Sequence, residues 1–332
     1  MNYSFSRRAA LAALAVITLA TVHATSQNVH AQTYPTKPVR IIVSYPPGGP
    51  VDALARPLAA GLSTLWGGVS VLVENKPGAN AIIGTDYVAK QPGDGYTLLL
   101  ANDPSLSSNQ YLYSKLPYDP VKDFVPVAGV ASTTLILLAP TTPPMASLQE
   151  LLAAAKAKPA TLTYGSIGPG SVTHLDAEAM ATTAGIQLVH VPYKGTSEVV
   201  PALLNGQISM ALTAIGPSLG LIRQGKLKAL AIASRQRSTL LPDVPTFNEA
   251  GLKFEARSWF ALAAPAGTPR AIVDKIAADT RKVVDAAEYR DKFIIGMGLD
   301  PFALGPDQFA EYLVRDRASY AERVRNAKVK LD

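Results

Sequence analysis

The chain has 332 residues, no cysteine, four histidines and a formal net charge of +6. At about 150 residues per domain, this length predicts two domains with hydrophobic cores of their own. Apolar residues make up 48% of the chain and charged residues 17%, which excludes a disordered protein. The absence of cysteine excludes disulfides, thiolate metal sites and thiol nucleophiles.

The first 31 residues have the pattern of an export signal. Arg7 and Arg8 form a positive start, and the apolar run 9–22 is shorter than the ~20 residues that span a bilayer. A small-residue cleavage pattern ends at Ala31. We therefore predict cleavage near Ala31 and a mature protein in the periplasm, without stable membrane insertion. Because the two arginines are adjacent, general secretory and twin-arginine export both stay open.

Removal of the signal leaves 301 of the 332 residues. Loss of Arg7 and Arg8 leaves 29 of 31 basic side chains against 25 acidic ones, a net charge of +4, and only His174 and His190 remain as histidines. This mild charge without a block of Lys or Arg is not typical of nucleic-acid-binding proteins. We therefore expect no nucleic-acid partner.

Apolar runs and helical patterns alternate along the first part of the mature chain. The expected elements in order are strand 39–45, helix 51–65, strand 69–73, helix 81–89 and strand 98–101. This alternation predicts a parallel sheet with helices on both faces. The β-branched run 127–138 that follows is long enough to leave one lobe and enter another.

The same alternation restarts in the second part of the chain. The expected helices are 148–157, 172–183, 197–205 and 217–224, and the expected strands are 161–164, 188–191, 208–212 and 229–233. A strand at 256–263 and helices 269–286, extended to 294, and 306–327 follow. We therefore expect a two-lobed α/β protein, with residues 32–131 and 256–332 in lobe 1 and residues 132–255 in lobe 2.

Each predicted lobe contains a strand, a glycine-rich turn and a helix in succession. Turn 46–50 (PPGGP) leads to Asp52, and turn 165–171 (GSIGPGS) leads to Thr173 and His174. Glycine lets the backbone turn sharply and approach a ligand, and the helix start offers unpaired N–H groups. Either turn alone fits an ordinary connection. Two at equivalent places predict opposed anion sites that bracket a carboxylate.

No catalytic or nucleotide motif accompanies these turns. Thr173 stands where a G-x-G-x-x-G motif would have its third glycine, and residues 164–168 (YGSIG) do not match G-x-S-x-G. His174 and His190 are sixteen residues apart without an H-E-x-x-H pattern, and His174 fits a capping or pocket-wall residue. We therefore expect no catalytic residues, no metal and no cofactor, with a hydrolase as the less favoured alternative.

Polar residues also lie at strand ends, where α/β sheets bind ligands. Ser105, Tyr193 and Thr213 each follow or end a predicted strand. For Ser105 or Thr213 taken alone, a polar loop is the better explanation. Lys194 either is solvated or adds positive charge to the cleft. Trp259 is expected in the core rather than against a ligand.

Seven short motifs occur in order along the mature chain. They are YPTKPVR (34–40), PPGG (46–49) with Asp52 and Ala55-Arg56, VENKPGA (73–79), DGYTLL (94–99), LPYD (116–119), HVPYKG (190–195) and LPDVPT (241–246). Together they resemble the Bug or TctC-like receptors of tripartite tricarboxylate transporters. The resemblance implies a periplasmic-binding-protein (Venus flytrap) fold with the ligand between the lobes.

The resemblance also implies the partners and the site. The implied partners are a small carboxylate ligand and integral-membrane transporter subunits. We expect the receptor to be a monomer. The alternative function is that of a ligand-binding subunit in a carboxylate-sensing pathway. In the family, the turn 47–52 closes over one carboxylate through backbone N–H groups and ordered water, and 166–174 faces it. The candidate ligand-binding residues are Pro47, Gly48, Gly49, Pro50, Val51, Asp52, Ser105, Ser166, Gly168, Gly170, Ser171, His174, Tyr193 and Thr213.

The chain departs from the family pattern at several of these places. Pro50 replaces Ser or Thr, residues 105–106 (SL) replace Thr-His, Pro169 replaces Asn, and residues 213–214 (TA) replace Asp-Asn. Each change removes a polar group, so we expect a ligand less polar than citrate, such as a monocarboxylate or an aromatic acid. Pro57, inside the next helical pattern, predicts a kink or a shifted helix start.

Overall fold

The computed structural model describes residues 34–142 and 145–331. Contacts divide the chain into residues 1–36 and 37–332, and the fold described below is that of the second unit. The predicted signal segment and its cleavage site at Ala31 lie outside the described residues. None of the helices described in these ranges is both long and apolar enough to cross a membrane.

Three parallel strands form the first part of the sheet. Strand β1 (Val39–Val43) lies between β2 (Val71–Asn75) and β3 (Thr97–Asn102) and pairs with both in parallel. Helix α2 (Pro50–Leu65) connects β1 to β2, and α3 (Ile82–Ala89) connects β2 to β3. The alternation predicted from the sequence is confirmed here, with strand ends displaced by one or two residues.

A second parallel set contains β5 (Thr163–Ser166), which pairs with β6 (Val189–Pro192) and β7 (Met210–Ala214). The helices of this part and the strand after them are α5 (Leu148–Ala157), α6 (Val172–Ala184), α7 (Thr196–Leu204), α8 (Ile215–Arg223) and β8 (Leu227–Ile232). Helix α5 matches its predicted range at both ends. Its N-cap Ser147 accepts a hydrogen bond from the Glu150 N–H, which explains the sharp start.

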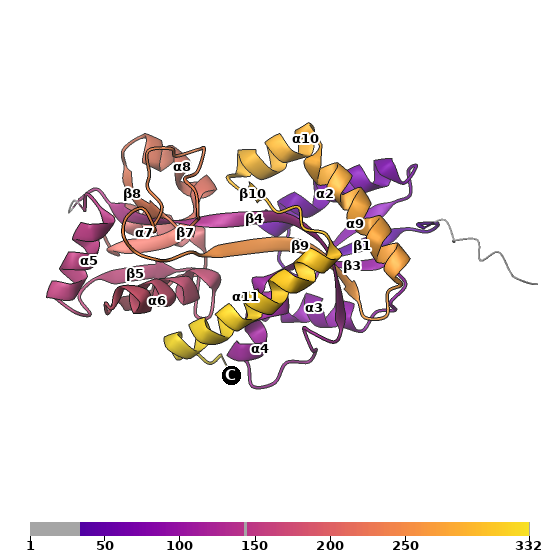
Figure 1. Ribbon diagram of the computed structural model, residues 1–332, viewed down its shortest axis with the longest axis horizontal. Helices are drawn as coiled ribbons and strands as arrows, with labels where there is room; N and C mark the ends of the chain where they lie inside the picture. The colour runs from indigo at the N-terminus through magenta and orange to yellow at the C-terminus, as the bar shows by residue number, and fades with distance from the viewer. Residues whose placement is uncertain (1–33, 143–144, 332) are drawn as a thin grey trace, which may run out of the picture. The chain divides into compact units, whose positions relative to one another are not determined.

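Two long antiparallel strands connect these parallel sets (Figure 1). Strand β4 (Phe124–Pro140) pairs with β9 (Arg257–Pro265) along its first part and with β7 and β8 along its last part. Strand β9 also pairs with β3, so the strand order is β2-β1-β3-β9-β4-β7-β5-β6. The two apolar crossing segments predicted from the sequence are therefore confirmed and are neighbours.

The chain ends in helices that pack back on the earlier elements. Helix α9 (Arg270–Asp285) packs on α2 and β4, and α11 (Pro306–Ala327) packs on β4 and on α6. Short elements between them include α10 (Ala287–Tyr289), a π-helical turn (Arg290–Ile294), a 3-10 turn (Ile295–Met297) and β10 (Asp300–Pro301), which pairs with β4. Because α11 contacts α6 as well, and residues 37–332 form one unit, the predicted lobe boundaries stay a prediction.

Two local features differ from the sequence-based expectation. Residues after β3 form a buried π-helical turn, Pro104–Ser108, and helix α4 (Asn109–Leu112), where the sequence predicts a polar loop. Helix α2 begins at Pro50 and continues through Pro57, so the predicted alternative of a shifted helix start is wrong. Pro50 fits the first helical turn because the N–H that it lacks would have no helical partner there.

Gly129 of β4 provides a test of how closely the crossing strands are packed. A Cβ at this position would lie 2.0 Å from the Phe302 carbonyl oxygen. We expect Gly129→Ala to lower the free energy of unfolding by about 1–3 kcal/mol because a buried backbone atom has to move. Urea unfolding followed by circular dichroism measures this.

The matched control is Gly220→Ala in α8, where a Cβ meets no atom within 4 Å. In a helix this change is expected to be neutral or to stabilise by up to about 1 kcal/mol. Equal unfolding midpoints for the two variants would contradict the close packing of β4.

Candidate functional site

The first glycine turn joins β1 to α2 and is held by Asp52. The Asp52 carboxylate accepts hydrogen bonds from the Gly48 N–H (3.0 Å), from Asn75 Nδ2 (3.0 Å) and from Arg56 Nε and Nη2 (2.8 Å each). The Arg56 bond, assisted by the Gly48 and Asn75 bonds, lowers the pKa of Asp52 to about 2. Asp52, which the sequence predicts to contact the ligand, is therefore already hydrogen-bonded within the protein, and it holds the turn in position.

The backbone of this turn presents unpaired donors. Pro47, Gly48 and Pro50 are exposed, and Gly49 is the N-cap of α2 without a side-chain hydrogen bond. In the described part of the chain, the N–H groups of Gly49, Val51 and Asp52 have no hydrogen-bond partner. A helix N-terminus with free N–H groups and an adjacent glycine pair suits an anion.

Ser105 lies deeper than the sequence suggests. Its side chain, 1% exposed, donates to the Asn102 carbonyl oxygen (2.7 Å) and accepts from the Asn102 N–H (2.8 Å). The Asn102 side chain in turn donates to the Tyr45 hydroxyl (2.8 Å), below the first turn, and burial raises the pKa of Tyr45 to about 12. Ser105 therefore shapes the end of β3, and a direct ligand contact from it stays a prediction.

The second glycine turn joins β5 to α6 and is held by hydroxyl groups. Ser171 caps α6, since its Oγ accepts from the His174 N–H (3.3 Å) and donates to the Gly168 carbonyl (2.6 Å). Gly168 (φ 123°) and Gly170 (φ 72°) have the left-handed backbone that favours glycine. Ser166 Oγ accepts from the Gly168 N–H (3.1 Å), so the turn is built largely from its own polar groups.

Two histidines stack beneath this turn. The rings of His174 and His190 lie 3.9 Å apart and nearly parallel, and the Tyr164 ring lies 5.0 Å from that of His190. His174 Nδ1 accepts from the Gly170 N–H (3.0 Å), which leaves its proton on Nε2 when the ring is neutral. Burial, reinforced by His190, lowers the pKa of His174 to about 4, and burial also lowers the pKa of His190.

His190 is the functional candidate that reasoning from the sequence missed. Sixteen residues separate it from His174, but the parallel pairing of β5 with β6 places His190 opposite Tyr164 and so next to the turn. The available signal was its place at the start of the HVPYKG motif, as one of only two histidines beyond residue 31.

The remaining predicted residues lie on different elements. Tyr193, half-buried, donates its N–H to the Ser166 carbonyl (2.9 Å), which places it beside the second turn. Thr213 is 3% exposed and pairs with Ile136 of β4. Among the described residues, no hydrogen bond or ion pair joins the turn 47–52 to the turn 166–174. Their arrangement around one ligand stays a prediction.

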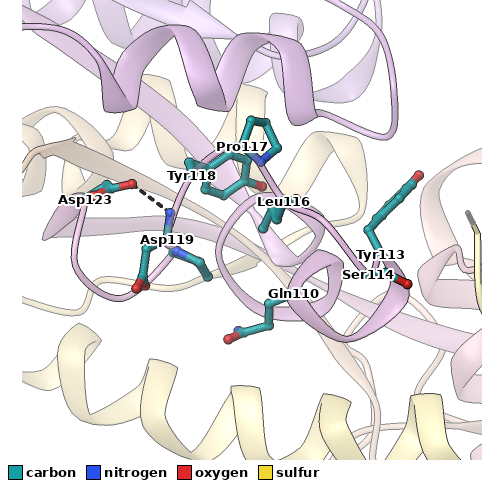
Figure 2. Close-up of a pocket in the computed structure, with 9 residues that line it drawn as sticks. Gln110, Tyr113, Ser114, Leu116, Pro117, Tyr118, Asp119 and Asp123 are labelled. Carbon is teal, nitrogen blue, oxygen red and sulfur yellow. Dashed lines mark hydrogen bonds between the residues drawn. The ribbon is translucent and has the colours of Figure 1, made fainter.

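A hollow of about 520 Å³ lies elsewhere, along the segment after α4 (Figure 2). It is lined by Gln110, Tyr113, Ser114, Leu116, Pro117, Tyr118, Asp119, Pro120 and Asp123. In the segment that lines this hollow, the Asp123 carboxylate accepts a hydrogen bond from the Asp119 N–H (2.7 Å), which the dashed line in Figure 2 marks. This bond joins the two ends of the loop 119–123. None of the candidate ligand-binding residues named from the sequence lines this hollow, although the LPYD motif (116–119) does. Nor do the described residues include a group of three or more side chains arranged to bind a metal.

Asp52→Asn tests the role of the carboxylate in the first turn. Because its pKa falls from 3.8 to about 2, ionised Asp52 stabilises the fold above pH 3.8, and this contribution is lost as the pH falls toward 2. We expect the free energy of unfolding of the variant to be lower by on the order of 1 kcal/mol at pH 7. The loss is modest because solvent screens the half-exposed Arg56. Urea unfolding at pH 7 and pH 3 measures it. A deficit of equal size at both pH values would contradict the ion pair.

Comparison with known proteins adds to this geometry. Residues 54–327 match the family model described as the tripartite tricarboxylate transporter family receptor. BugT of Bordetella pertussis is 36% identical over 305 residues, which cover 91% of this chain and 93% of BugT.

Solved structures are similar over most of the chain. A protein of R. palustris with adipate is 30% identical with a TM-score of 0.78, covering 90% of this chain and 99% of its own. MatC from Rhodopseudomonas palustris, with bound malate, is 29% identical with a TM-score of 0.73, covering 88% of this chain and 100% of MatC. The predicted two-lobed α/β periplasmic-binding-protein fold is thereby confirmed, and the chain belongs to the Bug or TctC-like family of tripartite tricarboxylate transporter receptors.

Proposed function

We propose that the protein is a periplasmic solute-binding receptor that captures a small carboxylate between its two lobes and delivers it to the membrane subunits of a transporter. The observation that carries this proposal is the group of unpaired N–H donors of Gly49, Val51 and Asp52 at the start of α2. Membership of the receptor family and the adipate and malate bound by its neighbours support the same ligand class.

The charges around the first turn are compatible with an anion. The bidentate Arg56 guanidinium neutralises the Asp52 carboxylate, so the turn presents N–H dipoles without an uncompensated negative charge. The carboxylate of the ligand then receives hydrogen bonds from the backbone, as at other helix N-termini.

The second turn offers donors of a similar kind. His174 is neutral with its Nδ1 occupied by the Gly170 N–H, so its Nε2–H is a donor, and in the described part of the chain this atom has no hydrogen-bond partner. We infer that it donates to the ligand from the second lobe. Neutral donors on both turns favour binding and release of an intact acid over chemistry on it.

The substituted positions favour a ligand less polar than citrate. Leu106 is 1% exposed and faces the core, and Pro50 removes one backbone N–H from the first helical turn. Pro169 and Ala214 similarly lack the side-chain polar atoms that the family pattern has at these places. Fewer donors and acceptors leave the extra hydroxyl and carboxyl of citrate without partners, which costs binding free energy.

Titration calorimetry of the purified protein with adipate, benzoate, malate and citrate tests the ligand class. We expect citrate to bind at least about tenfold more weakly than the best of the less polar acids, since about 1.4 kcal/mol separates each factor of ten. We also expect the bound acid to be recovered unchanged, as followed by NMR of the ligand. Tightest binding to citrate would overturn the specificity proposal, and a product formed from any acid would revive the hydrolase alternative.

Gly49→Val tests the first turn directly. Gly49 has φ −76°, which valine can adopt, and a Cβ there meets only the Pro46 carbonyl at 3.6 Å. We expect a folded protein whose affinity for the best acid falls tenfold or more, because the side chain blocks approach to the N–H groups.

Gly220→Val in α8, also with open space around its Cβ, is the control and should leave the affinity unchanged. Unchanged affinity of Gly49→Val would remove the first turn from the site. Gly168→Val would not isolate the loss of binding, because a φ of 123° strains any β-branched residue and the substitution would distort the turn itself.

A further inference from the structure

His190 contacts the second glycine turn from below, through Ser166. Its Nε2 lies 2.6 Å from Ser166 Oγ, and the same oxygen accepts the Gly168 N–H at 3.1 Å. Ser166 is fully buried at the end of β5, so its hydroxyl has few other partners. The imidazole nitrogen thereby fixes the direction of the hydroxyl, and the hydroxyl fixes the Gly168 peptide.

His174 contacts the same turn two residues further along. Its Nδ1 accepts the Gly170 N–H at 3.0 Å, and its ring stacks on that of His190 at 3.9 Å. The two glycines of the turn, each with a positive φ, are therefore attached to two imidazoles that touch one another. A change in the protonation or position of either ring therefore affects the backbone at both Gly168 and Gly170.

We propose that His190 is a positioning residue of the second glycine turn, which it keeps in shape through Ser166 and through its stack on His174 only while both rings are neutral. The consequence for ligand binding rests on the proposed function, whereas the effect on the turn does not.

Protonation of either ring rearranges these hydrogen bonds. A proton on His174 Nδ1 would face the Gly170 N–H, so two donors would oppose each other. In the tautomer that carries its proton on Nδ1, neutral His190 accepts from the Ser166 hydroxyl at Nε2. A second proton, on Nε2, would be donated to Ser166 Oγ, whose own proton would have to turn to the Gly168 carbonyl at 3.2 Å. Two imidazolium rings 3.9 Å apart would also repel each other.

The charged and titratable groups around the pair do not compensate such a proton. In the described ranges, no carboxylate contacts either ring. The groups on the packed elements include Tyr164 on β5, Glu178 on α6 bonded to the Tyr164 hydroxyl, Asp176 on α6 paired with Arg323 of α11, and half-buried Tyr193 and exposed Lys194 after β6. Because the folded state disfavours protonated His174, the turn 166–174 loses stability as the pH falls from about 6.5 toward 4.

The test is NMR of the ¹⁵N-labelled, ligand-free protein, with the Gly168 and Gly170 amide signals followed from pH 7.5 to 4.5. His190→Ala removes the acceptor and the stack, and His190→Gln retains an acceptor that cannot be protonated. Tyr164→Phe is the control, because it removes the bond to Glu178 at the same stack and leaves both imidazoles in place.

We expect the wild-type signals to move together as the pH falls below 6.5. At pH 7.5, His190→Ala displaces them, while His190→Gln and Tyr164→Phe leave them near the wild-type positions. Wild-type signals that do not move with pH overturn the proposal. So does a His190→Ala spectrum equal to that of wild type, or a Tyr164→Phe displacement as large as that of His190→Ala. If His190→Ala does not fold, the wild-type titration and the His190→Gln spectrum decide.

A binding measurement at pH 7.5 separates this proposal from the proposed function. With adipate as the probe, we expect His190→Ala to bind about tenfold more weakly than wild type and His190→Gln within about threefold, as for one hydrogen bond lost or retained. Equal affinity of His190→Ala and wild type would overturn the role in binding. Absence of wild-type binding to adipate, benzoate, malate and citrate alike, together with the expected NMR shifts, would count against the proposed function and leave the positioning of the turn supported.

Discussion

Strands β4 and β9 pair antiparallel from Phe124 opposite Pro265 to Thr134 opposite Arg257, and both parallel strand sets are attached to this pair. Strand β3 is bonded to β9, while β7 and β8 are bonded to the far part of β4. Nearly every residue of both strands is buried, so their backbone groups are satisfied by strand pairing rather than by water. The glycine turns follow β1 and β5, which depend on this pair for their place in the sheet.

Buried polar contacts reinforce the same region from the side of α11. The Asp103 carboxylate, fully buried after β3, accepts hydrogen bonds from the Ser258 hydroxyl, the Trp259 N–H and the Tyr320 hydroxyl. Burial raises the pKa of Asp103, and the nearby Asp316, which accepts from Trp259 Nε1, raises it further. Strand β3, strand β9 and helix α11 are thus joined by one network, whose buried groups each have a partner.

The two glycine turns are held in place by different kinds of interaction. The first is held by a charged pair, Asp52 with Arg56, and the second by neutral groups, Ser166 and the two stacked imidazoles. In both cases the side chains are engaged in the protein. Among the described residues, the donors left without a partner are the N–H groups of Gly49, Val51 and Asp52 in the first turn and His174 Nε2 in the second. A receptor that must release its ligand needs moderate donors of this kind rather than a strong countercharge.

The sequence by itself determined the alternation of elements, the extents of α5 and α11, and the two glycine turns. These depend on periodicity, caps and proline positions, which act within a few residues. The same reasoning identified Asp52 beside its turn but not that Arg56 and Asn75 engage its carboxylate.

Only the tertiary structure decided the contacts between distant segments. It placed His190 under the turn through the register of β5 with β6, and it directed Ser105 to the Asn102 backbone. It also brought β4 beside β9, more than a hundred residues later in the chain. Strand register and long-range pairing are selected by burial of the whole core, and no local spacing of residues encodes them.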